Sequence, residues 1–159
     1  MKLTHLDERG RPRMVDVGGK PQSERTATAE GAVRMSRAAF DMVAAQAVAK
    51  GNVLAVAEVA GIMGAKRTGE LIPLCHPIGL DLAEVEARLE PELPGVRITA
   101  VAKVTGRTGV EMEALTAVAV ACLTVYDMVK AVDRGMVIEE VRLVSKTGGT
   151  RGDWRRAEP

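Results

Sequence analysis

The longest apolar run of the chain lies within the segment Thr108–Gly135, where no charged residue separates Glu113 from Asp127. Apolar residues recur there at spacings of three and four, which is helical periodicity. Thr108 followed by Glu111 matches a capping box, and Gly135 suits the left-handed residue that closes a helix. The pattern predicts a helix buried on most sides, with its apolar stripe on Leu115, Val118, Ala119, Cys122, Val125 and Val129.

Strand periodicity is clearest in two neighbouring segments, residues 83–89 and 96–104, where apolar and mostly polar residues alternate. The two prolines of residues 90–95 predict a hairpin loop between them. Weaker alternation predicts a strand over Arg25–Met35 and a last strand over Met136–Val144. Arg13–Val17 is a further short extended candidate.

Two shorter helices are predicted between the first strand and the hairpin. Ser36 has the character of an N-cap, and Lys50-Gly51 of a helix end. Asn52 caps the second helix, and the prolines of Leu71–Pro77 predict a stiff loop after it. The stripe of the first of these helices is Phe40, Val43, Ala44, Ala47 and Val48.

The predicted order of elements matches a split β-α-β-β-α-β arrangement, since it runs strand, two helices, two strands, helix and strand. This predicts an α+β sandwich with helices on one face of an antiparallel sheet. We expect residues 1–159 to form one domain, with residues 1–12 and 150–159 flexible.

Composition excludes several protein classes. A net charge of +1 gives no general attraction to nucleic acid or to a membrane surface. Two cysteines are too few for a disulfide framework, and the first residues lack the apolar run of a signal peptide, so we expect a cytoplasmic protein. The apolar run over residues 114–125 is short and broken by threonines, so we expect no membrane span.

Familiar catalytic motifs are absent from the sequence. There is no Walker A pattern, no G-x-G-x-x-G after a strand and no G-x-S-x-G. The two histidines, His5 and His76, cannot form an H-E-x-x-H site, so we expect no metal and no cofactor.

Charged groups at the ends of apolar elements remain as candidates for chemistry. Judged alone, the i, i+3 spacing of Asp127 and Lys130 favours an exposed ion pair. Their apolar neighbours weaken this interpretation and indicate a partly buried acid with a tuned pKa instead. Glu113 lies fourteen residues before Asp127, or roughly 21 Å along a helix. One straight helix cannot easily bring both to one site, whereas two antiparallel copies about a two-fold axis can.

Single residues allow both structural and functional interpretations. His76 is compatible with a structural role, and Lys50 with stabilisation of a helix C-terminus. Lys146, before Thr147-Gly148-Gly149, suits an anion-binding nest or a flexible basic tail, and Arg25 is an ordinary surface candidate. Residue patterns alone therefore indicate an acid–base site that favours anions and is shared between subunits.

Six short motifs stand out along the chain: MVDV (14–17), AGIMGAKRT (60–68), LIPLCHP (71–77), TGVEMEALTA (108–117), YDMVKA (126–131) and KTGG (146–149). Together they resemble the motifs of the molybdenum cofactor biosynthesis protein C family, in order, with the family's spacing and over nearly the whole chain. The resemblance implies a ferredoxin-like subunit in a homohexamer of three dimers, with active sites at subunit interfaces. It also implies a cyclic pyranopterin monophosphate synthase, which converts 3′,8-cyclo-7,8-dihydroguanosine 5′-triphosphate to cyclic pyranopterin monophosphate and diphosphate.

The same resemblance assigns roles to individual residues. Asp127 falls on the catalytic acid–base position, with Lys50, Lys130 and Lys146 on lysines around the triphosphate and the reacting ring. Arg25 falls on a phosphate-side arginine. The remaining matches are substrate-binding positions, namely Leu74, Cys75, His76, Met112 and Glu113.

Other functions remain open from the residues alone. One is an enzyme that releases phosphate from another nucleotide, and another is a ligand-sensing oligomer without catalysis. A third is a non-catalytic nucleotide- or RNA-binding domain, because split β-α-β folds often bind RNA on the sheet. Aromatic residues would have to stack on the bases, and the chain has only Phe40, Tyr126 and Trp154, the first two in predicted helices.

Overall fold

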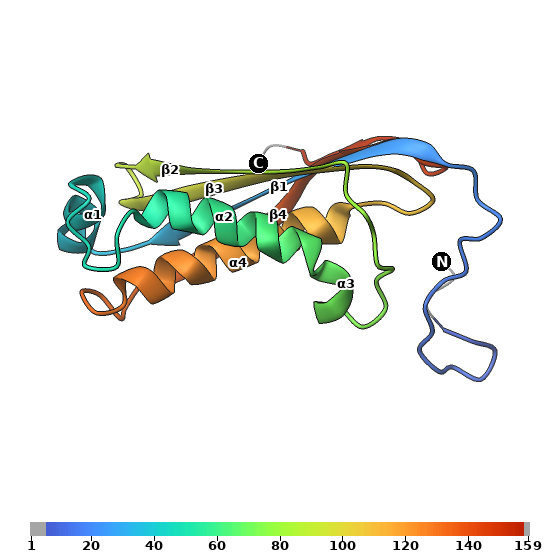
Figure 1. Ribbon diagram of the computed structural model, residues 1–159, viewed down its shortest axis with the longest axis horizontal. Coiled ribbons are helices and arrows are strands. Elements are labelled where there is room, and N and C mark those ends of the chain that lie inside the picture. The colour runs from blue at the N-terminus through green and yellow to red at the C-terminus, as the bar shows by residue number, and fades with distance from the viewer. Residues whose placement is uncertain (1–5, 158–159) are drawn as a thin grey trace.

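The computed structural model describes residues 6–157 as an α+β sandwich. One antiparallel sheet has the order β2-β3-β1-β4-β5, and helices α2 and α4 cover one of its faces (Figure 1). The order of β1 to β4 is that of a split β-α-β-β-α-β sandwich, so the predicted fold is confirmed. The elements are β1 (Ser23–Arg34), α1 (Arg37–Ala44), α2 (Val53–Lys66), α3 (Thr68–Leu71), β2 (Leu82–Glu90), β3 (Gly95–Gly106), α4 (Glu111–Val129), β4 (Val137–Thr147) and β5 (Trp154–Arg155).

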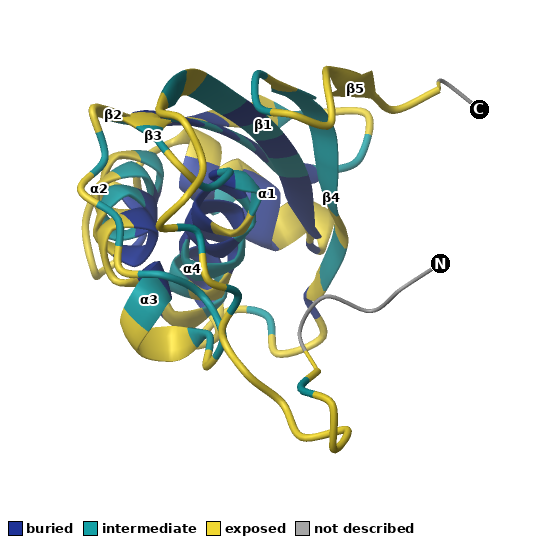
Figure 2. Ribbon diagram, turned by 90° about the vertical axis from the view of Figure 1, so that its right-hand side faces the viewer, coloured by how far each residue is buried: buried dark blue, intermediate teal, exposed yellow. Residues whose placement is uncertain are grey.

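The core lies between the sheet and α4 (Figure 2). Small residues let the helix approach the sheet closely: a Cβ on Gly31 of β1 would lie 2.6 Å from Val118 Cγ1 of α4. Gly61 and Gly64 of α2 similarly face α4. Although α4 has the length and composition of a membrane span, 56% of that stretch is buried within this fold. It is the central helix of the core.

Local signals predicted two of the helix starts. The Ser36 hydroxyl accepts a hydrogen bond from the Ala39 amide, and the Asn52 side chain accepts one from Ala55, as N-caps do. The predicted hairpin is confirmed by the pairing of Glu90 with Gly95.

Several predicted boundaries are wrong. The first helix ends at Ala44 rather than near Lys50, because Gln46 takes a positive φ of 54° and the chain turns. Val48 then packs back into the core. The Arg13–Val17 candidate forms no strand, whereas the short β5, which no pattern indicated, pairs with β4.

Both predicted caps of the central helix are also wrong. Its N-cap is Val110, with no side-chain hydrogen bond, so Thr108 and Glu111 make no capping box. The helix ends at Val129, and the Gly135 amide instead donates to Asp133 Oδ1. Flexibility of residues 1–12 and 150–159 stays a prediction, and residues 1–5, including His5, and 158–159 lie outside the described residues.

Candidate functional site

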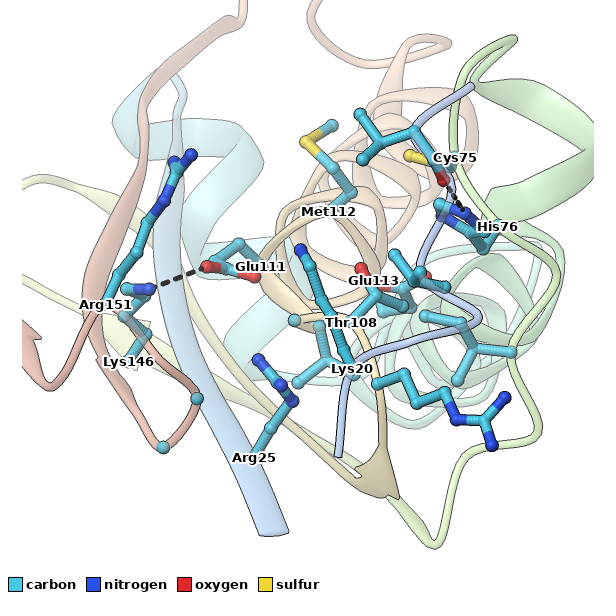
Figure 3. Close-up of a pocket in the computed structure, with 18 of the residues that line it drawn as sticks. Lys20, Arg25, Cys75, His76, Thr108, Glu111, Met112, Glu113, Lys146 and Arg151 are labelled. Atoms are coloured by element: carbon cyan, nitrogen blue, oxygen red, sulfur yellow. Dashed lines mark hydrogen bonds and ion pairs between the residues drawn. The ribbon is translucent and has the colours of Figure 1, made fainter. Parts of the chain in front are cut away.

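A cavity of about 590 Å³ opens at the end of the sandwich where α4 begins. Four segments form its walls: the N-terminal segment, the loop after α3, the turn before α4, and the loop between β4 and β5 (Figure 3). These segments are distant in sequence and meet because the sandwich places their ends together (Figure 1).

The inner part of the cavity holds a buried acid. Glu113, in the first turn of α4, is only 3% exposed, and burial raises its pKa to about 7. Cys75 lies nearby, and its thiol pKa is raised first by burial and then by the charge of Glu113. Ile72, Leu74 and Ile78 add apolar surface. This part of the cavity therefore suits a ring with few charges and groups that exchange protons near neutral pH.

His76 attaches the N-terminal segment to the cavity. Its Nε2 lies 2.7 Å from the carbonyl oxygen of Val15. Because a carbonyl only accepts hydrogen bonds, Nε2 is the donor in this contact. Val15 and Val17, from the Arg13–Val17 segment, and Lys20 after it thus form a wall of the cavity.

Basic side chains gather on the other side of the cavity. Lys146 Nζ lies 3.4 Å from Glu111, and Arg25 Nε donates to the Gly106 carbonyl at 3.0 Å. Figure 3 shows Lys146 and Arg25 beside Glu111 and Lys20. Five cations and two acids line the cavity, which leaves a net charge of +3 when all are ionised. The cavity is therefore suited to a polyanion.

A β-bulge directs Lys146 into this cavity. On β4, Ser145 pairs with Thr28 and Leu143 with Ala29, so Val144 has no partner on β1. Without the bulge, Lys146 would face away from the helices, because it lies three residues after the core-facing Leu143. With the bulge, Lys146 pairs with the buried Ala27 and points to the helix side.

A second cluster lies at the opposite end of α4. Lys50 Nζ donates to the Asp127 carboxylate at 2.7 Å and to the Asp127 carbonyl at 2.9 Å, while Lys130 Nζ lies 2.6 Å from the same carboxylate. The hydrogen bond from Lys130, followed by that from Lys50, lowers the pKa of Asp127 to about 2. The exposed ion pair of Asp127 and Lys130 is confirmed, and the predicted partial burial is wrong, since 55% of the Asp127 side chain is exposed.

The predicted site residues therefore divide into two groups. Lys50, Asp127 and Lys130 form the cluster just described, at the other end of α4 from the cavity. The cavity brings together Arg25, Leu74, Cys75, His76, Met112, Glu113 and Lys146.

Sequence reasoning missed three cations that line the cavity, Lys20, Arg107 and Arg151. For Arg107 a signal was present, because it lies within Thr105–Gly109, directly before the central helix. For Lys20 and Arg151 no local pattern distinguishes them from other surface cations. Among residues 6–157 no group of three His, Cys, Asp or Glu side chains could hold a metal ion, and the expected independence from metals stays a prediction.

Fold and cavity together define an α+β subunit of the ferredoxin-like type with a positively charged cavity. The sequence pattern of the MoaC family matches residues 14–149, and the chain belongs to this family. It is 56% identical to the cyclic pyranopterin monophosphate synthase of Parvibaculum lavamentivorans, over 97% of this chain and 96% of that protein. It is 54% identical to the protein of the same name from Brucella ovis, over 99% of this chain and 96% of the relative.

Proposed function

We propose that this protein is a cyclic pyranopterin monophosphate synthase that acts in molybdenum cofactor biosynthesis. Its substrate would be 3′,8-cyclo-7,8-dihydroguanosine 5′-triphosphate, and its products cyclic pyranopterin monophosphate and diphosphate. The observation that carries the proposal is identity above 50%, over nearly the full length of both chains, to relatives that bear this name. The enzyme would be a phosphorus–oxygen lyase, and we expect it to act in the cytoplasm.

The cavity supports this substrate class. A triphosphate carries about four negative charges, and five cations line the cavity without a P-loop to supply backbone amides instead. The apolar surface around Leu74 and Met112 suits the ring system. We propose substrate binding by Arg25, Leu74, Cys75, His76, Met112, Glu113 and Lys146.

The Lys50–Asp127–Lys130 cluster supports proton transfer. Ring opening and re-closure need groups that both give and take protons, and we propose this role for Asp127 with its two lysines. While both lysines bind it, the carboxylate is a weak base, because its pKa is about 2. Substrate phosphates that draw the lysines away would raise that pKa and strengthen Asp127 as a proton acceptor.

Formation of the cyclic phosphate also requires a phosphoryl transfer within the substrate. A substrate hydroxyl oxygen attacks the α-phosphorus, and the bond from that phosphorus to the α–β bridging oxygen breaks. The hydroxyl proton passes to a base, and diphosphate leaves with the bond's electron pair. Cations beside the leaving group, such as Lys130 or Lys146, would stabilise its developing charge.

The distance between the cavity and the Lys50–Asp127–Lys130 cluster supports an active site shared between two subunits. Glu113 and Asp127 are at opposite ends of α4, roughly 21 Å apart for an α-helix. We propose that the protein is a homohexamer of three dimers, in which the Asp127 end of one subunit completes the cavity of its two-fold partner. Each active site would then contain residues from two chains.

A turnover assay tests the proposal directly. Purified protein supplied with 3′,8-cyclo-7,8-dihydroguanosine 5′-triphosphate should release one diphosphate for each cyclic pyranopterin monophosphate formed. Absence of both products from correctly assembled protein would contradict it.

An RNA-binding role has little support, because strands β1 to β4 carry no aromatic residue on which a base could stack.

A further inference from the structure

Four of the five cavity cations make no ion pair within residues 6–157, and three of these four also make no side-chain hydrogen bond there. Lys146 pairs with Glu111, and Arg25 donates to a backbone carbonyl. Lys20, Arg107 and Arg151 have neither an ion pair nor a side-chain hydrogen bond to the rest of the described chain. Cations that line a cavity without a protein partner remain available to an anion. Arg151 differs from the other two because it comes from the C-terminal segment.

The loop that carries Arg151 is tightly folded. Gly148 and Gly149 have φ of 81° and 82°, which favours glycine, and the Gly148 amide donates to Asp153 Oδ1 at 2.9 Å. A Cβ on Gly149 would collide with the guanidinium of Arg25. The loop therefore lies directly against Arg25, and the chain then returns to pair with β4. This arrangement keeps Arg151 on the cavity wall beside Lys146 (Figure 3).

We propose that Arg151 binds the terminal phosphates of the substrate at the mouth of the cavity, and so holds the diphosphate that leaves. This inference rests on the proposed function. The buried Glu113 and the apolar side chains form the inner part of the cavity, whereas Arg151 is exposed. A substrate whose ring occupies the inner part extends its triphosphate outward, so the last phosphates reach the exposed cations. A guanidinium can bind two phosphate oxygens at once.

The register of β5 supplies both a reporter and a control. Trp154 pairs with Lys146, so its side chain lies on the cavity side of the sheet. It is the only tryptophan of the chain, and its fluorescence should respond to anions bound beside Lys146. Arg155 pairs with Ser145, which pairs with Thr28, so Arg155 lies on the opposite face. Arg155→Ala thus removes an equal charge four residues after Arg151, on the face of the sheet away from the cavity.

The test is a titration of the assembled protein with inorganic triphosphate, followed by calorimetry and by Trp154 fluorescence. Arg151→Ala should weaken binding about tenfold, and Arg151→Lys by less, because the charge remains while the bidentate contact is lost. Arg155→Ala should bind as the unchanged protein does. The proposal is overturned if Arg151→Ala and Arg155→Ala bind alike, or if the unchanged protein does not bind inorganic triphosphate.

Turnover separates this inference from the proposed function. In Arg151→Ala, KM should rise about tenfold and inhibition by added diphosphate should weaken similarly, with kcat nearly retained. If the unchanged protein turns over substrate but the variant shows the KM and diphosphate inhibition of the Arg155→Ala control, the role of Arg151 fails while the function stands. If triphosphate binding depends on Arg151 but no turnover occurs, the phosphate subsite stands and the synthase assignment fails.

Discussion

The ammonium group of Lys50 lies 2.7 Å from the carboxylate of Asp127, although the two residues are 77 positions apart in the chain. Lys50 also donates to the Asp127 carbonyl at the end of α4. A lysine near a helix C-terminus interacts favourably with the helix dipole. The sequence suggested this role for Lys50 on the helix that precedes it, whereas in the structure Lys50 lies at the C-terminus of α4. The contact joins the loop after α1 to the proposed acid–base residue.

Replacement of Asp127 by Asn should abolish turnover while fold and assembly are retained. The amide keeps the shape of the side chain but cannot take the proton, and more than half of the side chain is exposed, so the fold should be retained. Steady-state kinetics measures the effect, with Asp41→Asn on α1 as a control at another exposed acid. Turnover within about tenfold of the unchanged protein, a loss of only about 1.4 kcal/mol, would show that Asp127 is not the acid–base group.

Two inactive variants, Glu113→Gln and Asp127→Asn, should restore activity when refolded together in equal amounts. In a mixed dimer, one shared site carries both substitutions and the other carries neither. Random pairing makes half of the dimers mixed, so activity should recover to about a quarter of the unchanged protein.

A pull-down through a tag on one variant must first show that the subunits exchange. Each variant refolded alone is the matched control and should remain inactive. If subunits exchange and the mixture is still inactive, the active site does not combine the two ends of α4 from different chains.

Glu113 should make stability decrease as pH rises from about 5 to about 7. Burial raises its pKa from 4.5 to about 7, so over this interval the folded chain keeps a proton that the unfolded chain loses. The stability is fully present below the unfolded pKa and is lost as the pH approaches the folded one, by about 3 kcal/mol at most. Denaturant unfolding of the unchanged protein and of Glu113→Gln at pH 5 and pH 8 measures this. From pH 5 to pH 8, Glu113→Gln should lose less stability than the unchanged protein. Equal losses would show that the raised pKa of Glu113 does not cause the decrease.

Gly31→Ala should destabilise the fold by about 1–3 kcal/mol, because its Cβ would lie 2.6 Å from Val118 and 3.2 Å from Val141. The helix would have to move away from the sheet. Gly19→Ala is the matched control, since nothing lies within 4 Å of its added Cβ. Thermal unfolding compares the two variants, and equal midpoints would mean that α4 does not pack on Gly31 as described.

By itself, the sequence determined the order and type of the main elements and the family. Periodicity marks β2, β3 and α4 because a side chain's face follows from its position along a regular element. Ser36 and Asn52 mark helix starts because an N-cap bonds to amides only a few residues away. Motifs such as LCHP and GVEMEALTA predicted the residues that gather around the cavity.

Only the tertiary structure decided how those residues are grouped. The bulge at Val144 turns Lys146 toward the helices, and it depends on the register of a strand more than a hundred residues earlier. Glu111 pairs with Lys146 instead of capping α4, because β4 brings this cation to it. Glu113 acquires its raised pKa from the cavity walls that bury it, and Asp127 its lowered one from lysines before and after it in the chain. The Asp127–Lys130 pair is local, three residues apart, and the sequence pattern indicated it. The other contacts depend on packing between segments that are distant in sequence, which local patterns cannot encode.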